Sequence, residues 1–239
     1  MRALSERVVS PERGVTVTDV ALTTAFETRL EPALQVDGYR RLAPLHYGRI
    51  RYDVYQLLVV HFVSEASEFH VEHATMLLVE PHTFANFDLG GRFPESSAYS
   101  FGTQRDLSHD LETLLMEYLT VLRPRLQARA ALTGLMDVTL HQLGGSGSPH
   151  LWFTLAVGHA RLGDEKKARS FAGEALSRYR AHCVPSPDGS PNVNAPWAHK
   201  GEQRAELLVD ALYSGRIAPL LDGWRSGTIA ALGIAAIDT

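Results

Sequence analysis

The stretch from Gly38 to Glu80 constrains the fold more than any other part of the chain. It is the only region dense in β-branched and aromatic residues, and turn signals separate its apolar runs. Between Val54 and Phe62 the apolar residues crowd too tightly for simple alternation, which indicates a central strand covered on both faces at its end. A short further strand is expected at residues 98–101. The sequence therefore predicts a small antiparallel sheet of three or four strands.

Helical periodicity flanks this region on both sides. Before it, apolar residues at helical spacing end at Gly38, which offers a left-handed stop, and Pro32 is expected to bend that helix or end its regular part early. After it, a long helix is expected from Leu107 to near Pro124, followed by a second over residues 126–143. The predicted fold class is therefore α+β, with helices covering the sheet.

A glycine and serine segment at residues 144–148 is the clearest internal joint, because such a composition is flexible and buries little surface. Beyond it we expect helices over residues 151–162, 165–182, 202–213 and 217–224. The predicted organisation is a flexible arm at 1–17, an α+β domain at 18–143 and a helical subdomain at 149–239.

The first two C-terminal helices resemble a single tetratricopeptide repeat. The matching positions are Trp152, Leu155, Ala156, Gly163, Asp164, Ala168 and Ala175. Small residues let two antiparallel helices approach closely, while Trp152 fills the space between them. One repeat cannot bury its own hydrophobic face, and the period does not recur convincingly after Glu202. We expect a hairpin that packs on the rest of the molecule rather than an independent peptide-binding array.

The composition is ordinary for a globular protein, with 45% hydrophobic and 21% charged residues. No apolar leader is expected after Met1, and no apolar stretch, Leu57 to Val60 included, is long enough to span a membrane. The single cysteine, Cys183, excludes an internal disulfide and fits a reducing compartment; we expect it to be incidental rather than reactive. We therefore expect a cytoplasmic protein with no membrane partner.

The net charge of −4 argues against a nucleic-acid binder, but the charges are unevenly distributed. Residues 65–117 contain ten acidic side chains against two basic ones, whereas residues 118–180 contain nine basic against four acidic ones. Two interpretations remain open at this point. Either the solvated faces simply differ in charge, or the acidic region binds a basic partner.

Catalytic and metal-binding patterns are weak. His61, His70 and His73 lie on neighbouring predicted strands, but alternation puts His70 and His73 on opposite faces, so they are not expected to share one ion. The nearest set on one face, His70 with Glu68 and Glu72, is a poor metal site. The glycine and serine segment lacks the last glycine of a hydrolase elbow, and the chain contains no phosphate loop or dinucleotide fingerprint. We predict no catalytic residue, no metal and no cofactor.

Three short motifs resemble the uncharacterised bacterial family known as domain of unknown function 4304. They are Gly38-Tyr39-Arg40-Arg41, then His46-Tyr47 with Asp53-Val54-Tyr55-Gln56, and Glu68-Phe69-His70-Val71. The resemblance covers about residues 20–143, and His70 departs from it by standing where a threonine is usual. It supplies no catalytic residues. Some relatives belong to the small bacterial proteins that neutralise polymorphic toxins, so the resemblance implies an immunity-like role.

The predicted function is binding. The first hypothesis is an immunity-like inhibitor that binds a basic toxin protein through an acidic sheet-and-loop surface with aromatic anchors. The residues predicted to form that surface are Glu65, Glu68, Glu72, Phe84, Phe87, Asp88, Phe93 and Tyr99. The alternative is a non-catalytic scaffold that binds a peptide, or associates with itself, through the C-terminal helical hairpin. An enzyme with an unrecognised site is a third possibility, and the chain is expected to be a monomer or a homodimer.

Overall fold

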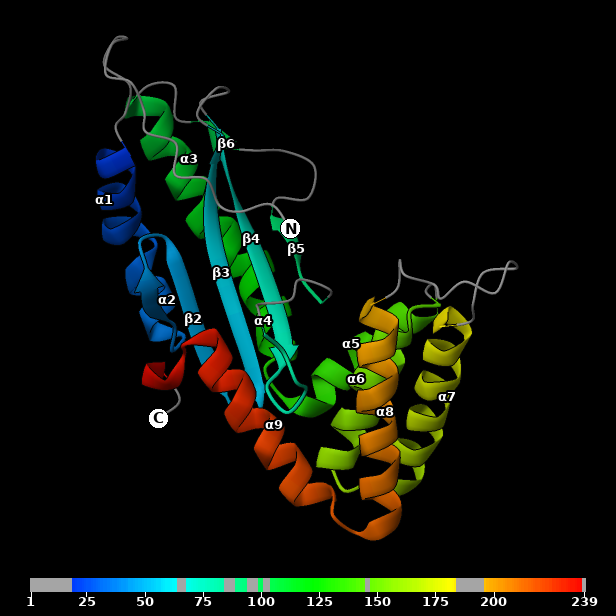
Figure 1. Ribbon diagram of the computed structural model, residues 1–239. Helices are drawn as coiled ribbons and strands as arrows, with labels where there is room; N and C mark the ends of the chain where they lie inside the picture. The colour runs from blue at the N-terminus through cyan, green and yellow to red at the C-terminus, as the bar shows by residue number, and fades with distance from the viewer. Residues whose placement is uncertain are drawn as a thin grey trace.

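The structure of the chain is a computed structural model, which describes residues 19–63, 68–83, 89–93, 99–100, 104–144, 147–183 and 196–237. It confirms the predicted α+β class, with an antiparallel sheet covered by helices and a set of C-terminal helices (Figure 1). The arm predicted at residues 1–17 lies outside the described residues. None of the helices in the described part of the chain is long and apolar enough to cross a membrane.

The strands of the described sheet all pair antiparallel. They are β1 (Arg40–Ala43), β2 (His46–Arg51), β3 (Val54–Val63), β4 (Glu68–Leu77), β5 (Gly91–Phe93) and β6 (Tyr99–Ser100). Their order is β1-β2-β3-β4-β5, and β6 pairs with β4 as well. The two central strands, β3 and β4, pair along their whole lengths. The sheet has more strands than the three or four predicted, because β1 and β5 are too short to produce a periodic signal.

One face of the sheet, here called the inner face, packs against the early helices (Figure 1). These helices are α1 (Asp19–Arg29), α2 (Glu31–Val36) and α3 (Gln104–Glu117). Alternation along the central strands turns Leu58 and Phe69 to this face, where they share a core with Phe26 of α1 and Leu114 of α3. As predicted, the first helix is interrupted beside Pro32, since α1 and α2 are separate helices.

The sequence predicted that the helix beginning with α3 would end near Pro124, but in the structure it continues past that residue. A π-helical turn, Tyr118–Leu122, carries it into α4 (Arg123–Ala128). Pro124 then occupies the first turn of α4, where its missing N–H is tolerated. In the π turn the backbone hydrogen bonds already depart from the regular α-helical pattern just before Pro124. The missing N–H of the proline therefore breaks no α-helical hydrogen bond, and the chain stays helical past Pro124.

The C-terminal helices form a bundle beside the end of the sheet (Figure 1). They are α5 (Leu132–Leu143), α6 (Pro149–Arg161), α7 (Glu165–Cys183), α8 (Pro196–Ser214) and α9 (Ile217–Leu232). The predicted hairpin is α6 with α7; Ala168, Ala172 and Ala175 are fully buried and allow close contact. Gly163 ends the first of these helices in the left-handed region, with φ of 77°.

The last two helices are longer than the short ones predicted. α8 begins at Pro196 and α9 continues to Leu232, so that α9 leaves the bundle and returns to the second, outer face of the sheet (Figure 1). There Ile229 packs with Tyr55 and Leu57 of β3, together with residues of a final 3₁₀ turn, Ala235–Ile237. The C-terminal region is therefore packed on the α+β region through both the bundle core and this second contact.

Candidate binding surface

The outer face of the sheet carries a polar group of residues at the end that α9 does not reach. We call it the outer-face patch, and it consists of His61 on β3 with Glu68, His70 and Glu72 on β4. His61 and His70 are directly opposed in the β3–β4 register, and the period of two on β4 turns Glu68, His70 and Glu72 to one face. Strand pairing alone therefore brings these four side chains together.

Within the patch, Glu72 lies between two stacked imidazoles. The ring centroids of His61 and His70 are 5.4 Å apart, with 20° between their planes. Glu72 Oε2 lies 3.0 Å from His61 Nε2, and Oε1 lies 3.6 Å from His70 Nε2. Burial, then the nearby charges of Arg92 and His61, lower the pKa of His70 below its usual value, so its ring is mainly neutral at neutral pH. In the strand register Arg92 on β5 lies opposite Glu72.

The patch is partly open to solvent, since the side chains of His61 and Glu72 are 44% and 37% exposed. A separate groove of about 520 Å³ lies on the same face beside α9 and the final turn, and its lining includes Leu57, Ile234 and the charged Arg41. The outer face therefore offers carboxylates at one end and a groove of mixed polarity at the other, and both can contact another protein.

The patch contains no nucleophile placed beside a base, and its imidazoles do not converge on one point. Each contacts a separate oxygen of Glu72 and the two rings are stacked, which is not the arrangement of ligands around a tetrahedral ion. His73 is buried on the inner side, opposite Leu58, in agreement with the expected alternation. The sequence predicts His70 with Glu68 and Glu72 on one face and His61 on a neighbouring strand. The β3–β4 register places His61 directly opposite His70 and so adds it to that set.

The residues predicted to bind a partner fall into three groups. Glu68 and Glu72 lie together in the outer-face patch. Phe93 and Tyr99 do not fit the role of exposed anchors: each is only 6% exposed and belongs to the inner core. Their short strands pair with β4 and direct these rings inward, where Tyr99 stacks on Phe69 at 5.0 Å. The other predicted residues, Glu65, Phe84, Phe87 and Asp88, lie outside the described residues.

Among the described residues, the acids of the stretch 65–117 do not all lie on one surface. Glu80 is buried where the sheet meets the bundle, Glu112 on α3 pairs with Arg29, and Glu117 accepts a hydrogen bond from Tyr99. These three acids therefore lie outside the outer-face patch.

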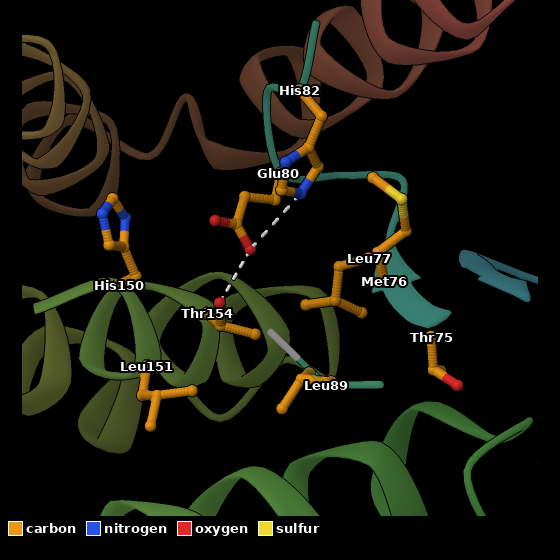
Figure 2. Close-up of a pocket in the computed structure, with 9 residues that line it drawn as sticks. All are labelled: Thr75, Met76, Leu77, Glu80, His82, Leu89, His150, Leu151 and Thr154. Atoms are coloured by element: carbon orange, nitrogen blue, oxygen red, sulfur yellow. Dashed lines mark hydrogen bonds and ion pairs between the residues drawn. The ribbon is translucent and has the colours of Figure 1, made fainter. Parts of the chain in front are cut away.

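A second candidate site, at the junction of sheet and bundle, has a structural role. Figure 2 shows Glu80 pointing between His82 and Thr154; Thr154 Oγ1 donates to Glu80 Oε2 at 2.8 Å, and His82 Nε2 lies 3.7 Å from that oxygen. Thr228 on α9 donates to the Glu80 carbonyl oxygen at 2.8 Å. The cavity is about 20 Å³, enough for about one water molecule. The cluster joins three elements and leaves no space for a substrate.

A buried polar network lies beneath the inner face, and the sequence did not predict it. Asp37 accepts hydrogen bonds from Tyr118 (2.6 Å) and forms an ion pair with Arg123 (2.7 Å). Arg49, only 2% exposed, donates to the Asp37 carbonyl oxygen and to Gln56 Oε1, each at 2.7 Å. Burial, and then the bond to Asp37, raise the pKa of Tyr118. The network fixes α2, the sheet and the π-helical turn to one another, and a buried arginine has no signature in a single sequence.

A shallow groove lies in the bundle, between the start of α6, the end of α7 and the start of α8. Its volume is about 500 Å³, and it is lined by Gly147, Ser148, Pro149, His150, His182 and Trp197. Trp197 is 41% exposed and lies against His150 and His182, at centroid distances of 5.5 and 5.1 Å. An exposed tryptophan beside a groove is a typical anchor site for a peptide.

Comparisons with known proteins matched nothing: no family model, no curated protein and no solved structure is similar to this chain. The resemblance of the three short motifs therefore remains a prediction.

Proposed function

We propose that this protein is a cytoplasmic, non-catalytic inhibitor that binds a basic toxin protein and neutralises it. The observation that carries the proposal is the open end of the outer sheet face, where Glu68 and Glu72 share one face of β4 beside the partly exposed His61. Carboxylates there provide charge complementarity to a basic partner, and the groove elsewhere on the same face adds contact area. The immunity-like role comes from the motif resemblance.

The patch is suited to an inhibitor because binding needs no chemistry at the interface. Carboxylates on a rigid pair of central strands are held in place without an ordering cost on binding, and they attract lysine and arginine side chains over several ångströms. The histidines between them, His61 and His70, offer rings for stacking against apolar or cationic groups.

The proposal is tested with the product of the gene directly upstream, which is the expected toxin. Wild-type chain co-expressed with that product should restore growth and bind it in surface plasmon resonance. The double variant Glu68→Gln, Glu72→Gln should associate several-fold more slowly with a weaker dependence on salt, because opposite charges accelerate encounter. The matched control, Glu165→Gln with Glu174→Gln on exposed α7, removes the same charge elsewhere and should leave the association rate unchanged.

The second candidate, a peptide-binding scaffold, is favoured by Trp197 in the groove of the bundle. It is distinguished in the same assay. If Trp197→Ala raises the dissociation rate while the double patch variant binds as wild type does, the binding site is in the bundle. If the wild-type chain neither restores growth nor binds the upstream product, the inhibitor proposal is wrong.

A further inference from the structure

Cys183, His199 and Glu202 converge where α7 ends and α8 begins. Cys183 is the last residue of α7, while His199 and Glu202 are three positions apart on α8 and so share one face of that helix. One possible ligand atom of each residue, sulfur, nitrogen and oxygen, lies within 4.8 Å of the other two. His199 Nδ1 lies 3.9 Å from Glu202 Oε2.

We propose that these three residues form a zinc site, with a fourth position open to water. The donor set of thiolate, imidazole and carboxylate is one that zinc accepts, and three protein ligands are enough when water completes the tetrahedron. Ligand atoms on a tetrahedral zinc ion are about 3.5 Å apart, given bonds of about 2.0 to 2.3 Å. The three ligand atoms, all within 4.8 Å of one another, would come closer together by side-chain rotation on binding the ion.

The surroundings of Glu202 prepare it to bind an ion. Arg180 Nε lies 3.1 Å from Glu202 Oε1, and Arg180 Nη2 lies 2.7 Å from Glu206 Oε1. Arg180 therefore holds one oxygen of Glu202 and leaves Oε2 toward His199. Hydrogen bonds of this kind orient the ligands of metal sites. The positive charge of Arg180 is shared with Glu206, and one thiolate with one carboxylate balances a divalent cation.

Cys183 would bind as the thiolate. A sulfur–zinc bond forms, the S–H bond breaks, and one proton passes to solvent. His199 binds as the neutral imidazole. The ion would tie the end of α7 to the first turns of α8.

The test uses Co²⁺ as a spectroscopic probe of the full chain, stripped of metal and kept reduced. Wild-type protein is expected to show a thiolate-to-cobalt charge-transfer band and the visible bands of a four-coordinate ion, and Zn²⁺ should abolish both. Cys183→Ser should lose the charge-transfer band. His199→Gln and Glu202→Gln should each weaken Zn²⁺ binding at least tenfold. Zn²⁺ should raise the melting temperature of the wild-type chain, and it should raise that of each variant by less.

Glu174→Gln is the matched control, because it removes an exposed carboxylate of α7 that pairs with Arg178 and lies outside the proposed site. It should bind Zn²⁺ as wild type does, and so should His109→Gln on α3. All variants are compared by circular dichroism without metal, since these partly exposed positions should leave the fold intact. The proposal is overturned if wild type shows no charge-transfer band, if the band persists in Cys183→Ser, or if Glu174→Gln weakens Zn²⁺ binding as much as Glu202→Gln.

Discussion

At the residue scale, the buried carboxylate of Asp37 holds together two side chains of the polar network beneath the inner face. Asp37 is 4% exposed and contacts Tyr118 through one carboxylate oxygen and Arg123 through the other. Asparagine removes the charge opposite Arg123 and turns an NH₂ group, which cannot accept, toward one of the two partners. We expect Asp37→Asn to lower the free energy of unfolding by about 2–4 kcal/mol, and Tyr118→Phe by about 1–3 kcal/mol. Urea unfolding of each variant measures both losses.

The exposed pair of Arg29 and Glu112 provides the comparison for that prediction. Their side chains are 49% and 63% exposed, so Glu112→Gln should cost less than about 1 kcal/mol. Equal losses for Asp37→Asn and Glu112→Gln would show that the network contributes no more than a surface ion pair.

At the element scale, the α6–α7 hairpin depends on two glycines with opposite requirements. Gly163 ends α6 with φ of 77°, whereas Gly173 lies exposed within α7 with nothing near its Cβ position. Gly163→Ala should destabilise the chain by about 1–2 kcal/mol, because alanine is strained in the left-handed region. Gly173→Ala should stabilise it by about 0.5–1 kcal/mol, because alanine favours the helix. Chemical unfolding curves of the two variants should shift in opposite directions, and shifts of the same sign would contradict the assigned turn and helix.

At the scale of the whole molecule, the α+β region and the bundle share contacts that tie them together. Asp53, at the turn between β2 and β3, forms salt bridges with two helices. Its Oδ2 lies 2.7 Å from Nε of Arg161 on α6, and its Oδ1 lies 3.1 Å from Nε of Arg225 on α9. The bundle core includes Val54 and Leu77 from the central strands. We therefore expect one cooperative thermal transition, in which tryptophan fluorescence and far-ultraviolet circular dichroism coincide. The fluorescence reports on the bundle, because Trp152, Trp197 and Trp224 all lie in its helices.

A variant at the shared contact tests this coupling directly. Ile229→Ala removes a buried side chain where α9 meets the sheet, and should shift both signals equally, by about 2–4 kcal/mol. Leu207→Ala, at a position 53% exposed on α8, should shift neither by a comparable amount.

Residues 149–239 expressed alone should show a broad, weakly cooperative melt. Separate transitions of the two signals, or a sharp melt of that fragment, would make the bundle an independent domain.

Local patterns in the sequence predicted the elements well where the evidence was periodic or stereochemical. The β-rich block from residue 38 to 80 became the central strands, Pro32 divided the first helix, and Ala168 and Ala175 permitted the close α6–α7 pair. The prediction was wrong about Pro124, since the π-helical turn lets the helix continue. It also made α9 too short, because its apolar spacing matches two different surfaces, the bundle and the sheet.

What the sequence determined by itself was the fold class, because side-chain periodicity and turn chemistry act over a few neighbouring residues. Only the tertiary structure decided which of those side chains meet. The β3–β4 register placed His61 against His70, the inward direction of the short strands buried Phe93 and Tyr99, and the packing of α7 on α8 brought Cys183 to His199 and Glu202. These contacts join residues distant along the chain, so they depend on how the elements pack and leave no local pattern in the sequence.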